Sequence, residues 1–96
     1  MFSFWQYPLQ FRDILYLQGL RDYVAIQTKD KKILTLQSLR SFEESLATDR
    51  FVRIHRSYII ALKQINYVER QRVYIGKTPP PISDSYRESL SKSIRR

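Results

Sequence analysis

Short β-rich segments separated by polar turns recur along most of this chain, and this pattern most constrains its fold. They are rich in Ile, Val, Leu, Tyr and Phe, side chains that fit the pleated, half-buried surface of a sheet. The predicted strand segments are residues 14–20, 22–28, 31–36, 50–57, 58–62, 64–70 and 72–76. The sequence therefore predicts a mainly β architecture.

A first helix is predicted where the spacing of apolar residues changes, in "SLRSFEESL" over residues 38–46. Leu39, Phe42 and Leu46 recur at helical spacing, which gives a short helix of two to three turns one apolar face. Ser41 and Glu44 have the spacing of a capping box, so we expect the helix to start at Ser41.

A second helix is predicted after the proline-rich segment 77–81, which should be a loop or the start of an edge strand because proline cannot donate a ladder hydrogen bond. Ser85 and Glu88 have capping-box spacing, and Leu90 and Ile94 are one turn apart. The architecture is therefore β-rich with two short helices.

Length and composition indicate one domain without disulfide or metal chemistry. The 96 residues suffice for one modest core, and residues 1–12 are expected to form a truncated or atypical first strand. The chain has no cysteine and one histidine, so we expect no metal and no disulfide. It shows neither a signal peptide nor an apolar run of membrane-spanning length, so a cytoplasmic location and no membrane partner are expected.

The charge balance is strongly basic, with 17 Lys and Arg against 9 Asp and Glu and a net charge of +8. Such an excess of positive charge can simply keep the surface well solvated. It can also favour binding to a polyanion, because binding releases counterions from the phosphate chain. Charge alone leaves both interpretations open. Two glycines are too few for the usual nucleotide-binding loops.

The segment "FVRIHRSYII", residues 51–60, holds the only histidine between two arginines. Strict alternation would not separate its apolar from its basic residues, so the strand should break near His55 or Arg56. The bend would expose Arg56 and Ser57, while His55 would hold it through a backbone hydrogen bond. No nucleophile or orienting carboxylate stands at a recognisable spacing, so catalysis by His55 in a hydrolase or nuclease is not expected.

Several segments in order resemble the LytTR domain, the DNA-binding output module of many bacterial response regulators. They are "DILYLQGLRDYVAIQT", "SLRSFEESL", "FVRIHRSYIIAL", "INYVE" and "PISDSYRESL", within residues 13–90. The resemblance implies a small antiparallel β domain of more than one sheet, with two short helices and no cofactor. It also implies a transcriptional regulator whose loops, rather than a recognition helix, enter successive major grooves of duplex DNA.

Three loops match those through which such domains contact DNA. Arginine is suited to guanine edges and phosphate, and an aspartate accepts from the cytosine amino group. The resemblance points to Arg56 as a base reader and to Arg53 and Ser57 as phosphate ligands. The full set of expected DNA-binding residues is Arg21, Asp22, Arg53, Arg56, Ser57, Ser83, Asp84 and Arg87.

Two positions depart from the family pattern. Ala61 stands where such domains often carry asparagine, and Asp84 stands where many carry a basic residue. An acid repels phosphate, so base reading near Asp84 is expected to be altered or absent. Asp84 and Ser85 are equally explained as helix caps.

The expected assembly is a homodimer on two half-sites. The sequence holds no receiver domain, which usually precedes this module, so it is either an excised output domain or a free-standing regulator. Phosphorylation of a receiver would then pair two output domains and raise affinity through effective concentration. The alternative is a single-stranded nucleic acid or RNA-binding β module that stacks bases on its tyrosines. Against it, the tyrosines in "NYV" and "VYI" are expected to face the core.

Overall fold

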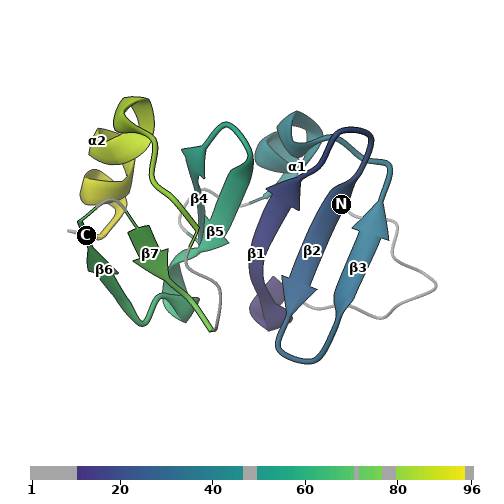
Figure 1. The fold of residues 1–96 in the computed structure, drawn as a ribbon, viewed down its shortest axis with the longest axis horizontal. Coiled ribbons are helices and arrows are strands. Elements are labelled where there is room, and N and C mark those ends of the chain that lie inside the picture. Colours follow the sequence, from purple (N-terminus) through teal and green to yellow (C-terminus); the bar gives the residue numbers. More distant parts are fainter. Residues whose placement is uncertain (1–10, 47–49, 71, 77–79, 95–96) are drawn as a thin grey trace.

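A five-stranded antiparallel sheet forms the centre of the molecule in the computed structural model, which describes residues 11–46, 50–70, 72–76 and 80–94. Its strand order is β3-β2-β1-β5-β4, and a separate two-stranded sheet pairs β6 with β7 (Figure 1). The strands are β1 (Ile14–Gly19), β2 (Val24–Thr28), β3 (Lys32–Thr35), β4 (Phe51–His55), β5 (Tyr58–Ala61), β6 (Tyr67–Glu69) and β7 (Arg72–Tyr74). The prediction of a mainly β, antiparallel domain of more than one sheet is confirmed.

Two helices and two single 3-10 turns complete the fold. They are η1 (Phe11–Asp13), α1 (Leu39–Ser45), η2 (Leu62–Gln64) and α2 (Asp84–Ile94). Residues 1–10 lie outside the described residues, and so does most of the segment expected as an atypical first strand. Neither described helix is long and apolar enough to cross a membrane.

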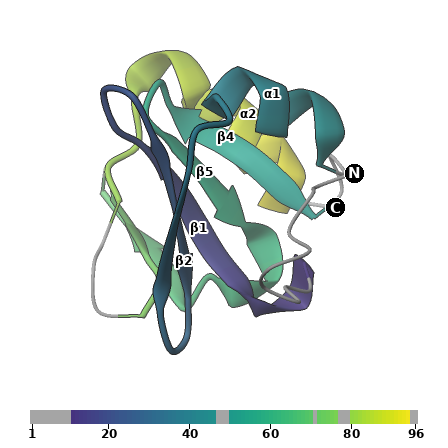
Figure 2. The same cartoon turned by 90° about the vertical axis from the view of Figure 1, so that its right-hand side faces the viewer.

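Each face of the central strands carries its own hydrophobic cluster. Leu17 and Ile59 pack on the face covered by α1, together with Phe42 of that helix. Tyr16 and Ile60 pack on the opposite face, with residues of β7 and α2. Figure 2 shows the strands edge-on beside the helices. Burial of these apolar side chains supplies the main free energy of folding.

Two bulges interrupt the strands where the alternation of side chains fails. In β1 the register shifts between Ile14 and Tyr16, which lets Ile14 join the same cluster as Leu17 three residues later. In β4 the register shifts between Arg53 and His55. An extra residue of this kind bends the strand and redirects the side chains beyond it. The strand break that the sequence predicts near His55 is therefore present.

The predicted start of the first helix is wrong, and the second helix starts one residue before Ser85. The N-cap of α1 is Ser38, whose extended backbone lets its hydroxyl accept a hydrogen bond from the Ser41 N–H at 3.0 Å. Ser41 is therefore the third helical residue. The second helix begins at Asp84, so Ser85 lies inside it, and Ile94 is 49% exposed although Leu90 is buried.

The expectation that the tyrosines of "NYV" and "VYI" face the core is also wrong. Tyr67 and Tyr74 are paired across β6 and β7, and their rings stack with centroids 4.5 Å apart. Tyr67 is 53% exposed, whereas Val73 on the other face of β7 is fully buried. Only one face of this two-stranded ribbon contacts the core, and alternation leaves the tyrosine pair on the other. Strand β6 is also shorter than the predicted 64–70, since Gln64 belongs to η2 and Arg70, with a φ of 56°, lies in the turn after the strand.

Replacing Phe51 by alanine is expected to lower the free energy of unfolding by about 3 to 5 kcal/mol, because its buried ring would leave a cavity beneath α1. Chemical denaturation measures the loss. Leu34→Ala is the control, since Leu34 lies on edge strand β3 and is 56% exposed. Equal stability of Phe51→Ala and the parent chain would contradict the register of β4.

Candidate nucleic-acid interface

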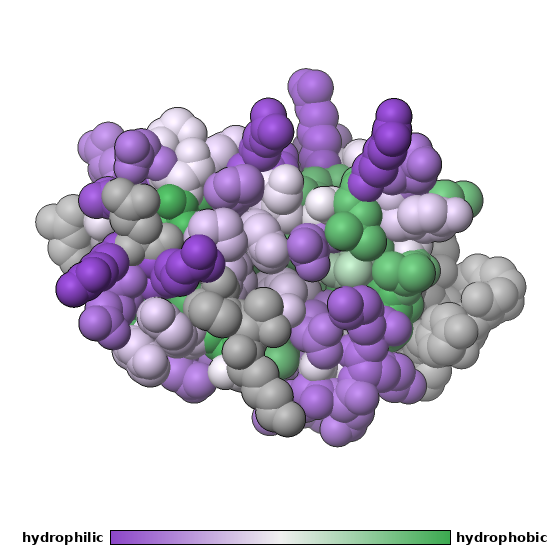
Figure 3. Space-filling view, in the orientation of Figure 1, coloured by the Kyte–Doolittle hydropathy of each residue, from purple (hydrophilic) through white to green (hydrophobic). Residues whose placement is uncertain are grey.

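Three connections gather at one end of the molecule. They are the turn between β1 and β2, the bend between β4 and β5, and the segment that enters α2, and Figures 1 and 2 place all three at the same end. Figure 3 shows hydrophilic side chains projecting from this end. These connections hold five of the eight residues expected to bind DNA, while Asp84 and Arg87 lie in the first turn of α2 and Arg53 lies in β4 just before the bend.

Backbone hydrogen bonds tie the three connections to one another. The Gly19 N–H donates to the Ser57 carbonyl at 2.7 Å, which joins the end of β1 to the bend. The Ser83 N–H donates to the Ile54 carbonyl at 2.8 Å, which joins the start of α2 to β4. Residues of the first two connections also line one hollow, Arg21 and Arg56 among them. The sheet therefore fixes the spacing between these loops.

Gly19 permits a close approach between the first connection and α1. A Cβ atom at this position would lie 2.8 Å from the Leu39 Cδ1 atom and 3.2 Å from its Cγ atom. Because Leu39 is buried in the cluster under α1, it has little room to move away. Glycine thus lets the helix sit directly beside the loop that carries Arg21.

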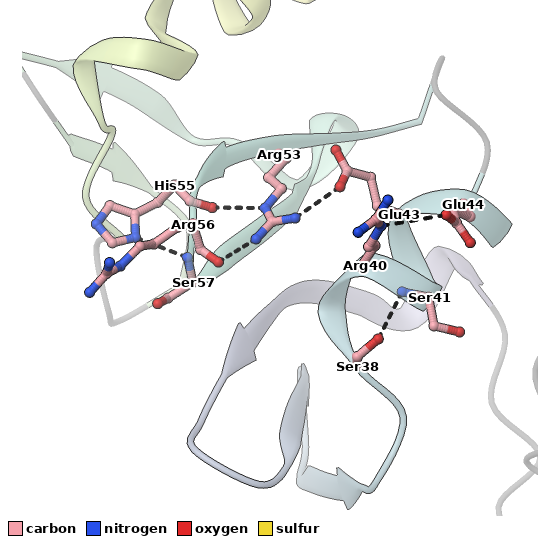
Figure 4. A network of polar contacts seen from close by, with 9 residues as sticks. All are labelled: Ser38, Arg40, Ser41, Glu43, Glu44, Arg53, His55, Arg56 and Ser57. Carbon is pink, nitrogen blue, oxygen red and sulfur yellow. Dashed lines mark hydrogen bonds and ion pairs between the residues drawn. The ribbon is translucent and has the colours of Figure 1, made fainter.

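Side chains of β4 hold the β4–β5 bend, and a side chain of α1 contacts one of them (Figure 4). His55 accepts a hydrogen bond at Nδ1 from the Ser57 N–H at 3.0 Å, a backbone contact of the kind that the sequence analysis expects. Arg53 donates from Nε to the His55 carbonyl at 3.2 Å and from a terminal nitrogen to the Arg56 carbonyl. Its other terminal nitrogen lies 2.9 Å from the Glu43 carboxylate of α1.

The arginines expected to bind DNA fall into two groups. Arg21 and Arg56 are exposed, and no hydrogen bond or ion pair to another described residue holds either guanidinium. In Figure 4 the Arg56 side chain extends away from α1. The Arg53 side chain is only 18% exposed and points toward α1. The first two are therefore available to an external ligand, whereas Arg53 is engaged inside the domain.

The first turn of α2, next to the third connection, carries a weak ion pair. Arg87 lies 3.4 Å from the Asp84 carboxylate, and both side chains are largely exposed. Such exposed pairs contribute little free energy. The Ser83 hydroxyl lies 3.2 Å from that of Ser85. Asp22 in the first connection is exposed, whereas Ser57 in the bend is half-buried.

Sequence reasoning missed Glu43 and Tyr86, which both contact Arg53. Glu43 lies ten residues before Arg53 on another element, and the Tyr86 ring centroid is 5.9 Å from the guanidinium carbon. No local spacing signals these contacts, because they depend on how α1 and α2 pack against β4. No cluster of three or more metal-binding side chains occurs among the residues that the structure describes.

The fold and this surface define a class of small, mainly antiparallel β domains with two sheets and exposed arginines on loops at one end. The family model of the LytTr DNA-binding domain matches residues 6–95, so the chain belongs to this family of DNA-binding domains. The family is one of DNA-binding domains and not of enzymes.

Two curated relatives are transcriptional regulators of Paraburkholderia xenovorans (strain LB400). The chain is 37% identical over 54 residues to the heme-containing CO-sensing transcriptional regulator RcoM 2, covering 56% of this chain and 20% of that protein. It is 36% identical over 55 residues to the heme-containing CO-sensing transcriptional regulator RcoM 1. This match covers 57% of this chain and 21% of that protein. The chain thus spans about a fifth of the length of these relatives.

A solved structure shares the fold. It is the LytTr DNA-binding domain of a putative methyl-accepting/DNA response regulator from Bacillus cereus, with a TM-score of 0.82 and 24% sequence identity. The match covers 91% of this chain and 85% of that one. The arrangement of two sheets and two helices is therefore that of a LytTr domain.

Replacing His55 by phenylalanine is expected to lower the free energy of unfolding by about 1 kcal/mol, because the half-buried Ser57 N–H loses its acceptor. Chemical denaturation and the exchange rate of the Ser57 amide measure the effect. The control is His55→Asn, whose Oδ1 can take the place of Nδ1 as acceptor. A phenylalanine variant with parental stability and parental exchange at Ser57 would show that this bond does not hold the bend.

Proposed function

We propose that this chain binds duplex DNA sequence-specifically as the DNA-binding part of a bacterial transcriptional regulator, with its loops inserted into successive major grooves. The observation that carries the proposal is the pair of exposed, unengaged arginines, Arg21 and Arg56, on neighbouring loops at one end of a LytTr domain. A net charge of +8 adds attraction to the phosphate backbone.

Base reading is assigned to the first two loops. Arg56 is the principal base reader, because its guanidinium can donate two parallel hydrogen bonds to guanine O6 and N7. Arg21 takes a guanine edge or a phosphate, and Asp22 accepts from a cytosine amino group. Ser57, beside Arg56, binds phosphate through its hydroxyl.

The third loop has a smaller part in this proposal. Asp84 repels phosphate and already neutralises part of the Arg87 charge at 3.4 Å. Ser83 and Arg87 therefore contribute positioning contacts to the DNA backbone, with base reading reduced at this loop.

The same proposal extends to the assembly. Residues 1–96 form a single domain that acts in the cytoplasm, and a receiver or other sensory domain elsewhere in the full-length protein controls it. Two copies bind two half-sites as a homodimer, so that pairing raises affinity through effective concentration. The named relatives support only the presence of further domains, since both are regulators in which the matched region is about a fifth of the length.

A second candidate, binding of single-stranded nucleic acid or RNA, has one observation in its favour. The stacked Tyr67 and Tyr74 pair on β6 and β7 offers aromatic surface to unpaired bases. Direct competition between duplex and single strands of the same sequence separates the candidates. Preference for the duplex supports the proposal, whereas preference for the single strand, lost in Tyr67→Leu, supports the second candidate.

Replacing Arg56 by alanine is expected to weaken binding to the preferred duplex by about 1 to 3 kcal/mol and to relax the preference at one base pair. Fluorescence anisotropy with a panel of single-base-pair variants measures both effects. The control is Arg12→Ala, which removes an equal charge from the exposed turn η1. Equal weakening by Arg56→Ala on every sequence would instead make Arg56 a phosphate ligand.

A further inference from the structure

We propose that Arg53 is a positioning residue, which sets the direction of Arg56 by joining the β4–β5 bend to α1 instead of binding phosphate itself. This inference rests on the proposed function, because it concerns how the same loop reads a base. It changes the role expected from the sequence, in which Arg53 is a phosphate ligand.

The first support is the geometry of the guanidinium. Its Nε and one terminal nitrogen donate to the carbonyls of His55, the last residue of β4, and of Arg56, the first residue of the turn. One rigid plane thus holds two consecutive peptide groups, which fixes the backbone from which the Arg56 side chain extends. Arginine can do this because its donors form a fork, whereas a lysine ammonium is a single point.

The second support is the charge that already faces Arg53. The Glu43 carboxylate lies 2.9 Å from its remaining terminal nitrogen, and the Tyr86 ring lies at cation–π distance. A phosphate that approaches this guanidinium meets the Glu43 carboxylate, whose negative charge repels it. The ion pair therefore links the bend to α1. The contact between Arg53 and the Tyr86 ring links the bend to α2 as well.

The two roles predict opposite behaviour of a lysine in this place. Lysine keeps the positive charge, so it serves a phosphate contact almost as well, but it cannot hold both carbonyls and the carboxylate at once. If Arg53 positions the bend, Arg53→Lys loses discrimination between bases although the charge is unchanged. If Arg53 binds phosphate, Arg53→Lys keeps discrimination, and Arg53→Gln reduces the salt dependence of binding.

The test measures the ratio of the dissociation constant for a duplex altered at the base pair that Arg56→Ala relaxes to the dissociation constant for the preferred duplex. We expect Arg53→Lys to reduce this ratio about tenfold, the equivalent of about 1.4 kcal/mol, with an unchanged slope of log affinity against log salt. Faster exchange of the Ser57 amide at unchanged global stability should accompany the loss.

A second variant keeps the proposal testable if Arg53→Lys does not fold. Glu43→Gln removes the negative charge that pairs with Arg53 on α1 but leaves the hydrogen bonds from Arg53 to the two carbonyls. This variant should reduce the same ratio of dissociation constants several-fold. Its control, Glu44→Gln, removes the adjacent exposed carboxylate, which pairs with Arg40. Parental ratios in both Arg53→Lys and Glu43→Gln would overturn the positioning role.

A shallower salt slope in Arg53→Gln, by about 0.9 for one phosphate, with the parental ratio in Arg53→Lys would also overturn it. The failure of the proposed function looks different. In that case the parent chain itself binds every duplex sequence alike, whatever the variants of Arg53 and Glu43 do.

Discussion

Burial of both faces of the paired strands β1 and β5 is the constraint on which the rest of the structure depends. Leu17 and Ile59 are partners across these strands on one face, and Tyr16 and Ile60 are partners on the other. A slip of one residue would exchange the two faces, so this double burial fixes the register. It thereby fixes where the connections at the ends of the strands emerge.

The candidate site follows from this register through short polar contacts. The bond from the Gly19 N–H to the Ser57 carbonyl continues the β1–β5 pairing into the loops. Beyond it, the bulge in β4 turns the chain, and Arg53 and His55 hold the turn from opposite sides. The proposed base reader Arg56 is therefore exposed on a backbone that is itself well supported, as a site that depends on precise geometry requires.

Features that depend on local pattern could be predicted from the sequence, and features that depend on packing could not. The strands and the break near His55 follow from side-chain alternation and β propensity. The cap of α1 was misplaced because both Ser38 and Ser41 suit the role and only the backbone selects between them. The exposed Tyr67 reflects which face of β6 and β7 the core covers.

For the candidate site, the three loops could be expected, but the inward orientation of Arg53 depends on Glu43, a partner from a separate helix. The central claim, sequence-specific reading of duplex DNA by these loops, is tested most directly by selecting binding sites from a random duplex pool with the purified chain. We expect a recurrent motif, as two half-sites about one helical turn apart. A retained pool without any motif would contradict it, because charge alone would then account for the binding.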